Sequence, residues 1–263
     1  MNYYFMVRVP GLKGAVTLAN FTCVDGYVAW PSDCIAHVLW SDGKSWQVRA
    51  LCDIRAGSSI TFREEDLPSD CPADASVFYF LYPRPLPKVV DAPPLDYDMH
   101  SQPGWRGNII VRGQNMSTSY VGEYPHGMVS IERGSLLSFA TFQQNGGDVG
   151  TQFVLPNMRL NPAIEPATVR FVSGRTRRVL KEITCLRNRV SVVPVDDIAV
   201  DPADMVVAVS GDITGVPLYL THTRDFSQMS FEHTHPPVEY LVFGDRWQFQ
   251  RSMKEWWIKE AFA

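Results

Sequence analysis

The sequence predicts a mainly β (α+β) protein: an antiparallel β sandwich or barrel with a small N-terminal β module and a C-terminal amphipathic helix. Three observations support this fold class. Short β-prone runs recur between glycine-containing turns, which is typical of antiparallel sheets. A proline-rich segment interrupts these runs, and the apolar residues near the C-terminus change to a helical spacing. Of the 263 residues, 45% are hydrophobic and 20% are charged, as in globular proteins.

The N-terminal module is expected to cover residues 1–82. Its β-like runs are residues 3–9, 35–40, 46–51, 59–62 and 77–82. Residues 83–104 follow as a connector, because they contain six prolines and proline cannot donate a hydrogen bond to a sheet ladder. A larger antiparallel region is expected over 105–235, where further short runs follow one another at hairpin spacing.

Residues 236–263 predict a helix packed on that larger region. Two prolines suit its first turn, where their missing N–H groups cost no hydrogen bond. Gly244 weakens the first half, so the helix has an alternative start at Asp245. Trp257 lies at the edge of the predicted apolar stripe. The stripe itself contains Val238, Val242, Phe249, Met253 and Trp256.

Composition and charge exclude several classes of protein. A net charge of -4 and a pI near 5.9 argue against binding nucleic acid over a broad positive surface. No window reaches the roughly 18 apolar residues of a membrane-spanning helix, and no secretory signal is evident. The five cysteines include no CxxC pair, which favours reduced thiols and a cytoplasmic protein.

The strongest charge pattern lies between residues 170 and 223. Residues 170–189 carry seven Lys or Arg and one acidic residue, whereas 190–223 carry five Asp and no basic residue. Opposite charges on neighbouring strands provide a simple explanation, since they neutralise each other. The functional interpretation places residues 174–178 at a hairpin tip. There the guanidinium groups of Arg175, Arg177 and Arg178 would hold a carboxylate, sulfate or phosphate.

A second pattern, His-x-His-x-x-x-Glu, contains His233, His235 and Glu239. It resembles the first metal motif of cupins, whose two imidazoles and carboxylate bind one ion. The resemblance implies a divalent transition metal, with His222 or His126 as a further ligand. Two features depart from that family. No histidine follows His235, and the predicted helix places Glu239 on a helix instead of a strand.

Residues 27–67 resemble the C-terminal strands of SET-domain methyltransferases, through the runs 27–35 and 48–62. The second run is also similar to the small SAF β-domain. Ala29 and Trp30 stand where SET enzymes bind the methyl donor with Asn-His, and Glu64 stands where they place the catalytic tyrosine. The resemblance therefore implies at most a degenerate β module without methyltransferase activity.

The leading hypothesis is a ligand- or partner-binding β protein without a cofactor, which recognises an anionic small molecule or a protein. The first alternative is a metal-dependent, cupin-like enzyme. The second is a structural or assembly subunit, which an exposed face at Trp256 and Trp257 would favour. The sequence leaves open whether the protein is an enzyme and whether it forms oligomers.

Overall fold

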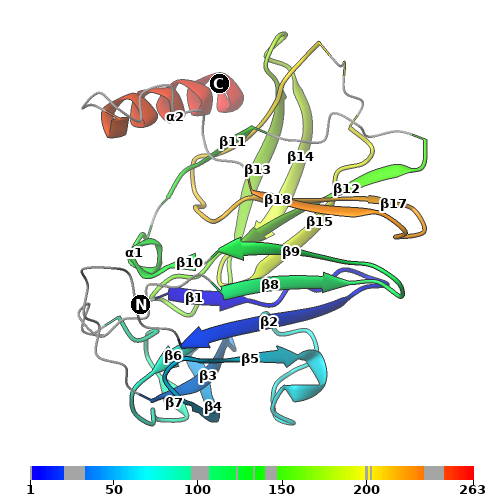
Figure 1. The fold of residues 1–263 in the computed structure, drawn as a ribbon. Helices are drawn as coiled ribbons and strands as arrows, with labels where there is room; N and C mark the ends of the chain where they lie inside the picture. The colour runs from blue at the N-terminus through cyan, green and yellow to red at the C-terminus, as the bar shows by residue number, and fades with distance from the viewer. Residues whose placement is uncertain are drawn as a thin grey trace. The chain divides into compact units, whose positions relative to one another are not determined.

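The computed structural model describes residues 2–20, 33–95, 107–122, 124–132, 134–139, 147–198, 201, 203–233 and 246–263 (Figure 1). This part of the chain is mainly β, with antiparallel sheets and a C-terminal helix, as the sequence predicts. It divides into two compact units. Unit 1 contains Met1–Glu132, Met158–Glu165 and Asn188–Val190, and unit 2 contains Arg133–Asn157, Pro166–Arg187 and Ser191–Ala263.

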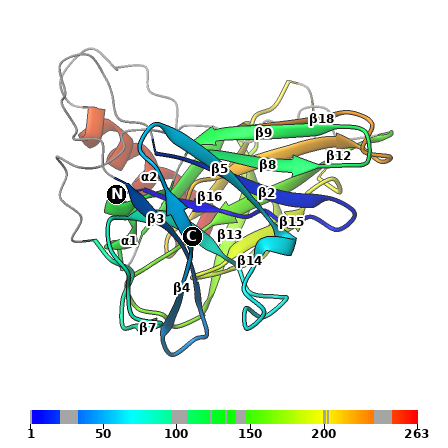
Figure 2. The same cartoon turned by 60° about the horizontal axis from the view of Figure 1, so that its bottom comes forward.

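Two antiparallel sheets form unit 1 in the described ranges. The larger has the order β10 (Tyr124–Pro125), β1 (Asn2–Phe5), β6 (Phe78–Tyr82), β3 (Cys34–Ser41), β4 (Trp46–Ile54) and β7 (Val89–Val90). The smaller has the order β5 (Ser58–Arg63), β2 (Lys13–Asn20), β8 (Gly107–Arg112) and β9 (Ser117–Gly122), which lie side by side in Figure 2. Two short helices, η1 (Glu64–Asp66) and α1 (His126–Val129), follow β5 and β10.

The core of unit 1 contains side chains from both of its sheets. Val38 and Tyr79 of the larger sheet lie in one cluster with Val16 and Phe62 of the smaller. The rings of Phe62 and Tyr79 stack with their centroids 5.6 Å apart. Strand side chains alternate between faces, so the large sheet has a second face, where Phe80 is also fully buried. Burial of apolar side chains on both faces therefore stabilises this sheet.

The proline-rich segment runs along the large sheet. The Tyr3 hydroxyl donates to the carbonyl oxygen of Pro94 at 2.5 Å, and the Val48 N–H donates to that of Lys88 at 2.8 Å. Pairing of β2 with β8 joins strands from before and after this segment in one sheet. The segment therefore does not separate two sheets. The boundaries 1–82, 83–104, 105–235 and 236–263 stay predictions about independent folding.

Unit 2 also contains two antiparallel sheets among its described residues. One has the order β11 (Leu136–Phe139), β16 (Val206–Ser210), β13 (Pro166–Ser173) and β14 (Val179–Leu186). The other has the order β15 (Val190–Pro194), β12 (Val149–Pro156), β17 (Leu218–Thr223) and β18 (Met229–His233). Helix α2 (Arg246–Phe262) completes the unit.

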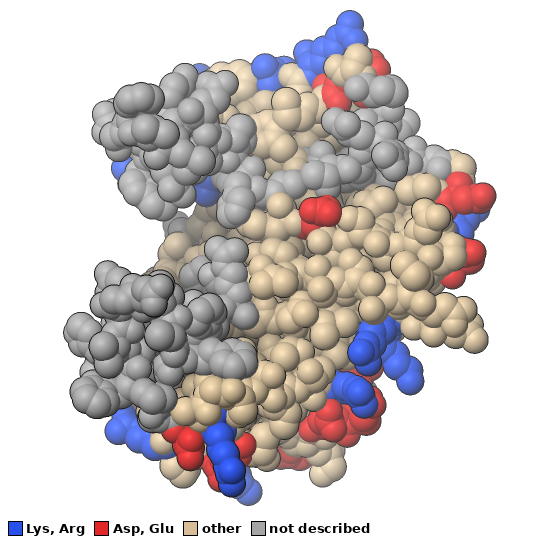
Figure 3. All heavy atoms as spheres, in the orientation of Figure 1, with Lys and Arg blue, Asp and Glu red and all other residues tan. Residues whose placement is uncertain are grey.

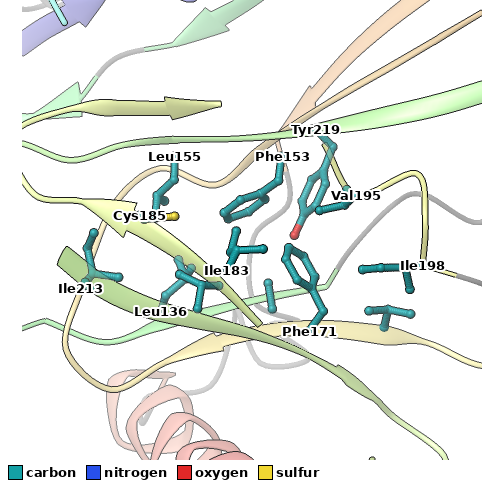
Figure 4. Packing of buried hydrophobic residues seen from close by; sticks show 14 residues of the cluster. Leu136, Phe153, Leu155, Phe171, Ile183, Cys185, Val195, Ile198, Ile213 and Tyr219 are labelled. Carbon is teal, nitrogen blue, oxygen red and sulfur yellow. The ribbon is translucent and has the colours of Figure 1, made fainter. Parts of the chain in front are cut away.

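One core cluster joins the two sheets of unit 2, and Figure 4 shows its side chains converging. Phe153 of β12 meets Phe171 of β13 edge-on, with ring centroids 5.3 Å apart. Tyr219 of β17 lies against Phe153, and its buried hydroxyl is 3.1 Å from Ser138 Oγ. This hydrogen bond satisfies the one polar atom of that ring, which is otherwise costly to bury.

The expected arrangement, a small N-terminal β module followed by one simple sandwich or barrel, is wrong for the described ranges. The described ranges form four antiparallel sheets, two in each unit. The reason lies in pairings between segments far apart in sequence. Thr17 of β2, for example, is paired with Asn108 of β8. The local succession of strand-like runs and turns does not indicate which distant strands pair with each other.

The C-terminal helix is present, and Met253 of the predicted stripe packs on the sheet, but the described part of the buried face is shifted towards Trp257. Trp257, predicted at the edge of the stripe, is only 6% exposed, whereas Trp256, predicted within it, is 44% exposed. Ala261, one turn after Trp257, is also buried. Residues 236–245 lie outside the described ranges, so the predicted start at Pro236 or Asp245 stays a prediction.

His37 on β3 is a fully buried histidine in unit 1. Its ring stacks on Phe80 with centroids 5.2 Å apart, and its Nδ1 donates to the carbonyl oxygen of Ile35 at 3.1 Å. Within the described residues, Nε2 has no hydrogen-bond partner. Burial lowers the pKa of His37 below 6.5, although the hydrogen bond to Ile35 acts in the opposite direction.

We expect His37 to make the protein less stable at mildly acidic pH. The unfolded chain takes up a proton below a pH of about 6.5, whereas buried His37 does not, so stability falls as the pH drops. The expected slope from this residue approaches about 1.4 kcal/mol per pH unit. Urea unfolding from about pH 7 to pH 5 measures it, and His37→Phe should flatten the profile. An unchanged profile in His37→Phe would contradict the assignment to His37.

Candidate functional site

The β13–β14 hairpin carries the three arginines that the sequence analysis selected. Its two strands pair from Pro166 with Leu186 to Val172 with Val179, so residues 174–178 form the predicted tip. The Ser173 N–H donates to the Arg178 carbonyl oxygen at 2.9 Å, and the Arg177 N–H donates to the Ser173 carbonyl oxygen at 3.0 Å. Arg177 has a left-handed backbone, with φ of 62°. These bonds fix where the arginine side chains leave the turn.

Asp204 holds the base of the tip. Its carboxylate accepts hydrogen bonds from the Ser173 hydroxyl and from the backbone N–H groups of Arg175 and Met205, at 2.8 and 2.7 Å for the two N–H groups. Burial acts to raise the pKa of Asp204, but these hydrogen bonds outweigh it and hold the pKa below the ordinary value. The Asp204 carboxylate is therefore ionised and stabilises the backbone of the turn.

Most basic residues of the 170–189 block have a carboxylate partner, in agreement with the simple explanation of the charge pattern. Their N···O distances lie between 2.5 and 3.7 Å. The pairs have exposed partners, so each contributes little to stability, about 0–1 kcal/mol. They are Arg170–Glu182, Arg175–Asp201, Lys181–Asp197 and Arg187–Asp212.

Arg177 and Arg178 differ from their neighbours. In the described part of the chain, neither side chain has an ion pair or a hydrogen bond. The Arg177 guanidinium lies over the rings of Trp256 and Trp257 of α2, 4.4 and 4.5 Å from their centroids. A cation–π contact uses none of the N–H groups of the guanidinium, so these donors stay available for a ligand. Arg177 is thus held in place with its donors unused.

Helix α2 packs on the sheet that contains the hairpin. Trp257 and Ala261 lie in one cluster with Val172 of β13 and Val207 of β16. Lys254 Nζ donates to the carbonyl oxygen of Ser135 at 3.4 Å, and burial lowers the pKa of Lys254. The indoles of Trp256 and Trp257 meet nearly at right angles. The helix therefore brings two aromatic rings to the hairpin tip.

Arg170 holds the C-terminal end of α2. Its Nη1 donates to the carbonyl oxygen of Ala261 at 2.6 Å, and its guanidinium lies 4.3 Å from the ring centroid of Phe262. The last carbonyls of a helix have no partner within it and attract a cation. Sequence reasoning missed this role, and also the pairing of Arg177 with both tryptophans. The only signal was the adjacent Trp256 and Trp257, whose partners lie some 80 residues earlier.

The structure does not bring His222 and His233 of the metal alternative together. On the β17–β18 ladder, His222 is paired with Met229 and His233 is paired with Leu218. They are four residues apart along the strands, about 13 Å. Among the described residues, no three His, Cys, Asp or Glu side chains are placed to hold one metal ion. His235 and Glu239 lie outside these ranges, so their part of the hypothesis stays a prediction.

A pocket of about 210 Å³ lies beside the β17–β18 hairpin. His222 borders it, and its Nδ1 donates to the Thr223 carbonyl oxygen at 2.8 Å, which leaves Nε2 as an acceptor. The His222 ring lies 4.5 Å from Phe226, measured between centroids. The lining contains no Lys, Arg, Asp or Glu: it consists of Val149, Thr221, His222, Thr223, Gln228, Met229 and Ser230. It therefore lacks the cations of an anion site.

Comparison with protein-family models, with curated proteins and with solved structures finds no match for this chain. The SET-like or SAF-like interpretation of residues 27–67 and the cupin-like interpretation of residues 233–239 therefore stay predictions. In the part of the chain that the structure describes, no helix combines the length and the apolar character needed to cross a membrane. The geometry of its own residues therefore supports the candidate site.

We expect Arg170→Met to loosen the end of α2. The substitution removes the hydrogen bond to Ala261 and the contact with Phe262, which together contribute roughly 1–2 kcal/mol. Hydrogen exchange of the α2 amides measures the loss of protection. Arg175→Met is the matched control, because its exposed ion pair with Asp201 contributes little. Equal effects of the two substitutions would contradict the role of Arg170.

Proposed function

We propose that this protein binds an anionic group of a small molecule or of a protein partner through Arg177 and Arg178. One observation carries the proposal: in the described β13–β14 hairpin these two arginines have no carboxylate partner, whereas Arg170, Arg175 and Lys181 each have one. Two neighbouring unpaired guanidinium groups create a local excess of positive charge on a chain whose net charge is negative.

The surroundings of Arg177 favour binding over simple solvation. Restricting a long side chain normally costs binding energy, and stacking on Trp256 and Trp257 has already restricted this one. The guanidinium fork matches carboxylate, sulfate and phosphate oxygens equally well. Arg175 lies two residues away, and its ion pair with Asp201 is exposed enough to exchange for a ligand. Figure 3 shows Lys and Arg side chains, with Asp or Glu side chains beside them, at the top of the view, where the β13–β14 hairpin turns in Figure 1.

The assembly alternative also receives support, because Trp256 is 44% exposed although Trp257 is buried. An exposed tryptophan beside unpaired arginines is typical of a protein–protein interface. We therefore regard partner binding and anion binding as two aspects of the same surface. The cysteines Cys34, Cys52, Cys71 and Cys185 are free thiols, which supports our proposal of a reducing, cytoplasmic compartment.

The double variant Arg177→Ala/Arg178→Ala tests the proposal. Calorimetric titration with sulfate, phosphate and citrate should show an affinity roughly ten- to a hundredfold lower than in the wild type, since hydrogen bonds to charged groups contribute about 1.5–3 kcal/mol. The slope of affinity against salt concentration should also decrease.

Lys181→Ala/Arg187→Ala is the charge-matched control. It removes the same number of positive charges, but from residues that are paired with Asp197 and Asp212. It should retain most of the affinity. Unchanged affinity and unchanged salt dependence in Arg177→Ala/Arg178→Ala would remove the proposal.

A further inference from the structure

Five residues around the tip of the β13–β14 hairpin form an exposed surface that is both basic and apolar. We call it the hairpin–helix surface and define it as Arg177, Arg178, Val179, Met205 and Trp256. Val179, Met205 and Trp256 are 46, 47 and 44% exposed. We propose that this surface binds a protein partner through an extended segment that carries both acidic and apolar side chains. The inference rests on the proposed function and names its ligand.

Direct contacts join the segments that carry these five residues. Arg178 directly precedes Val179, and Val179 pairs with Val172 at the end of the hairpin. The Gly174 N–H donates to the Met205 carbonyl oxygen at 2.6 Å, which places Met205 beside the turn. The contact of Arg177 with Trp256 adds α2 to the same surface. Three segments that are distant in sequence therefore meet here.

The apolar side chains argue for a protein partner instead of a free ion. Tryptophan, arginine and methionine are enriched at the centres of protein interfaces, and Trp and Arg provide many of their strongest contacts. An inorganic anion would contact only the guanidinium groups and would leave Val179, Met205 and Trp256 in water. A segment with leucine or phenylalanine beside its carboxylates would bury them, at about 25 cal/mol per Å² of apolar area.

The charges around the surface favour an acidic partner. The two carboxylates of unit 2 nearest to the turn are already engaged, Asp201 with Arg175 and Asp204 with Ser173 and backbone N–H groups. The described side chains of α2 include three basic and two acidic residues: Arg251, Lys254, Lys259, Glu255 and Glu260. Three arginines of the turn face these two carboxylates, so the described tip keeps an excess of one positive charge, and Arg177 and Arg178 are the arginines without an ion pair.

A peptide titration tests the inference. The parent probe is a short peptide in which glutamates flank leucine and phenylalanine. It is compared with sulfate and with two altered peptides. One has glutamines in place of the glutamates, and the other has serines in place of the leucine and phenylalanine. We expect the parent peptide to bind at least about tenfold more tightly than sulfate or either altered peptide. Arg177→Ala/Arg178→Ala should abolish the binding of both peptide and sulfate.

Met205→Ser/Val179→Thr separates the two proposals, since it removes apolar side chains and leaves both arginines. It should weaken peptide binding roughly tenfold and leave sulfate binding unchanged. Met116→Ser/Val121→Thr is the matched control, because these residues of unit 1 are 41 and 55% exposed. It should change neither.

Three outcomes would overturn the inference. Sulfate binding without preferred peptide binding, or peptide binding insensitive to Met205→Ser/Val179→Thr, would refute the acidic–apolar segment while the anion site stands. Failure to bind either ligand would remove the proposed function together with the inference. Tighter binding to phosphatidylserine vesicles than to the peptide would assign the surface to a membrane. Concentration-dependent self-association that Met205→Ser/Val179→Thr abolishes would assign it to a second copy of this chain.

Discussion

Two indole rings of α2 lie against the guanidinium of Arg177, and this contact joins the end of the chain to a turn some 80 residues earlier. Trp257 belongs at the same time to the apolar cluster that seats the helix on β13 and β16. The position of the helix and the position of the Arg177 side chain therefore depend on each other. Arg170 attaches the helix at a second point, because its Nη1 donates to the Ala261 carbonyl oxygen near the C-terminal end of α2. The candidate site is for this reason a tertiary feature, although its arginines are neighbours in sequence.

The charge distribution of unit 2 combines neutralisation with a local exception. Four basic residues of the 170–189 block pair with carboxylates across strands and loops. Asp204 shapes the turn through hydrogen bonds to Ser173 and to the backbone. Arg177 and Arg178 differ from these residues, because neither has a carboxylate partner in the described hairpin. The sequence does not show this difference, since it presents seven basic residues of the same kind.

Local signals predicted the elements that depend on local chemistry. The turn at residues 174–178 was predicted as a hairpin tip, and the C-terminal helix was predicted from its apolar spacing. Strand partners did not follow, because the pairing of β2 with β8 depends on the whole unit. The buried face of the helix was predicted only in part, because Met253 of the predicted stripe packs on the sheet whereas Trp256 is exposed. The predicted stripe combined residues 238–256, whereas Val172 and Val207 of the sheet select Trp257 and Ala261. Sequence reasoning found the arginines but not which of them are paired.

The left-handed backbone of Arg177 places two demands on one position. A φ of 62° suits glycine, and a residue with a Cβ atom in this region pays about 1 kcal/mol in conformational energy. The contacts of the side chain with Trp256 and Trp257 require arginine. Selection for heat resistance alone would draw this position towards glycine, at the expense of the stacked guanidinium. Position 177 thus combines a backbone conformation that favours glycine with side-chain contacts that only arginine makes in this structure.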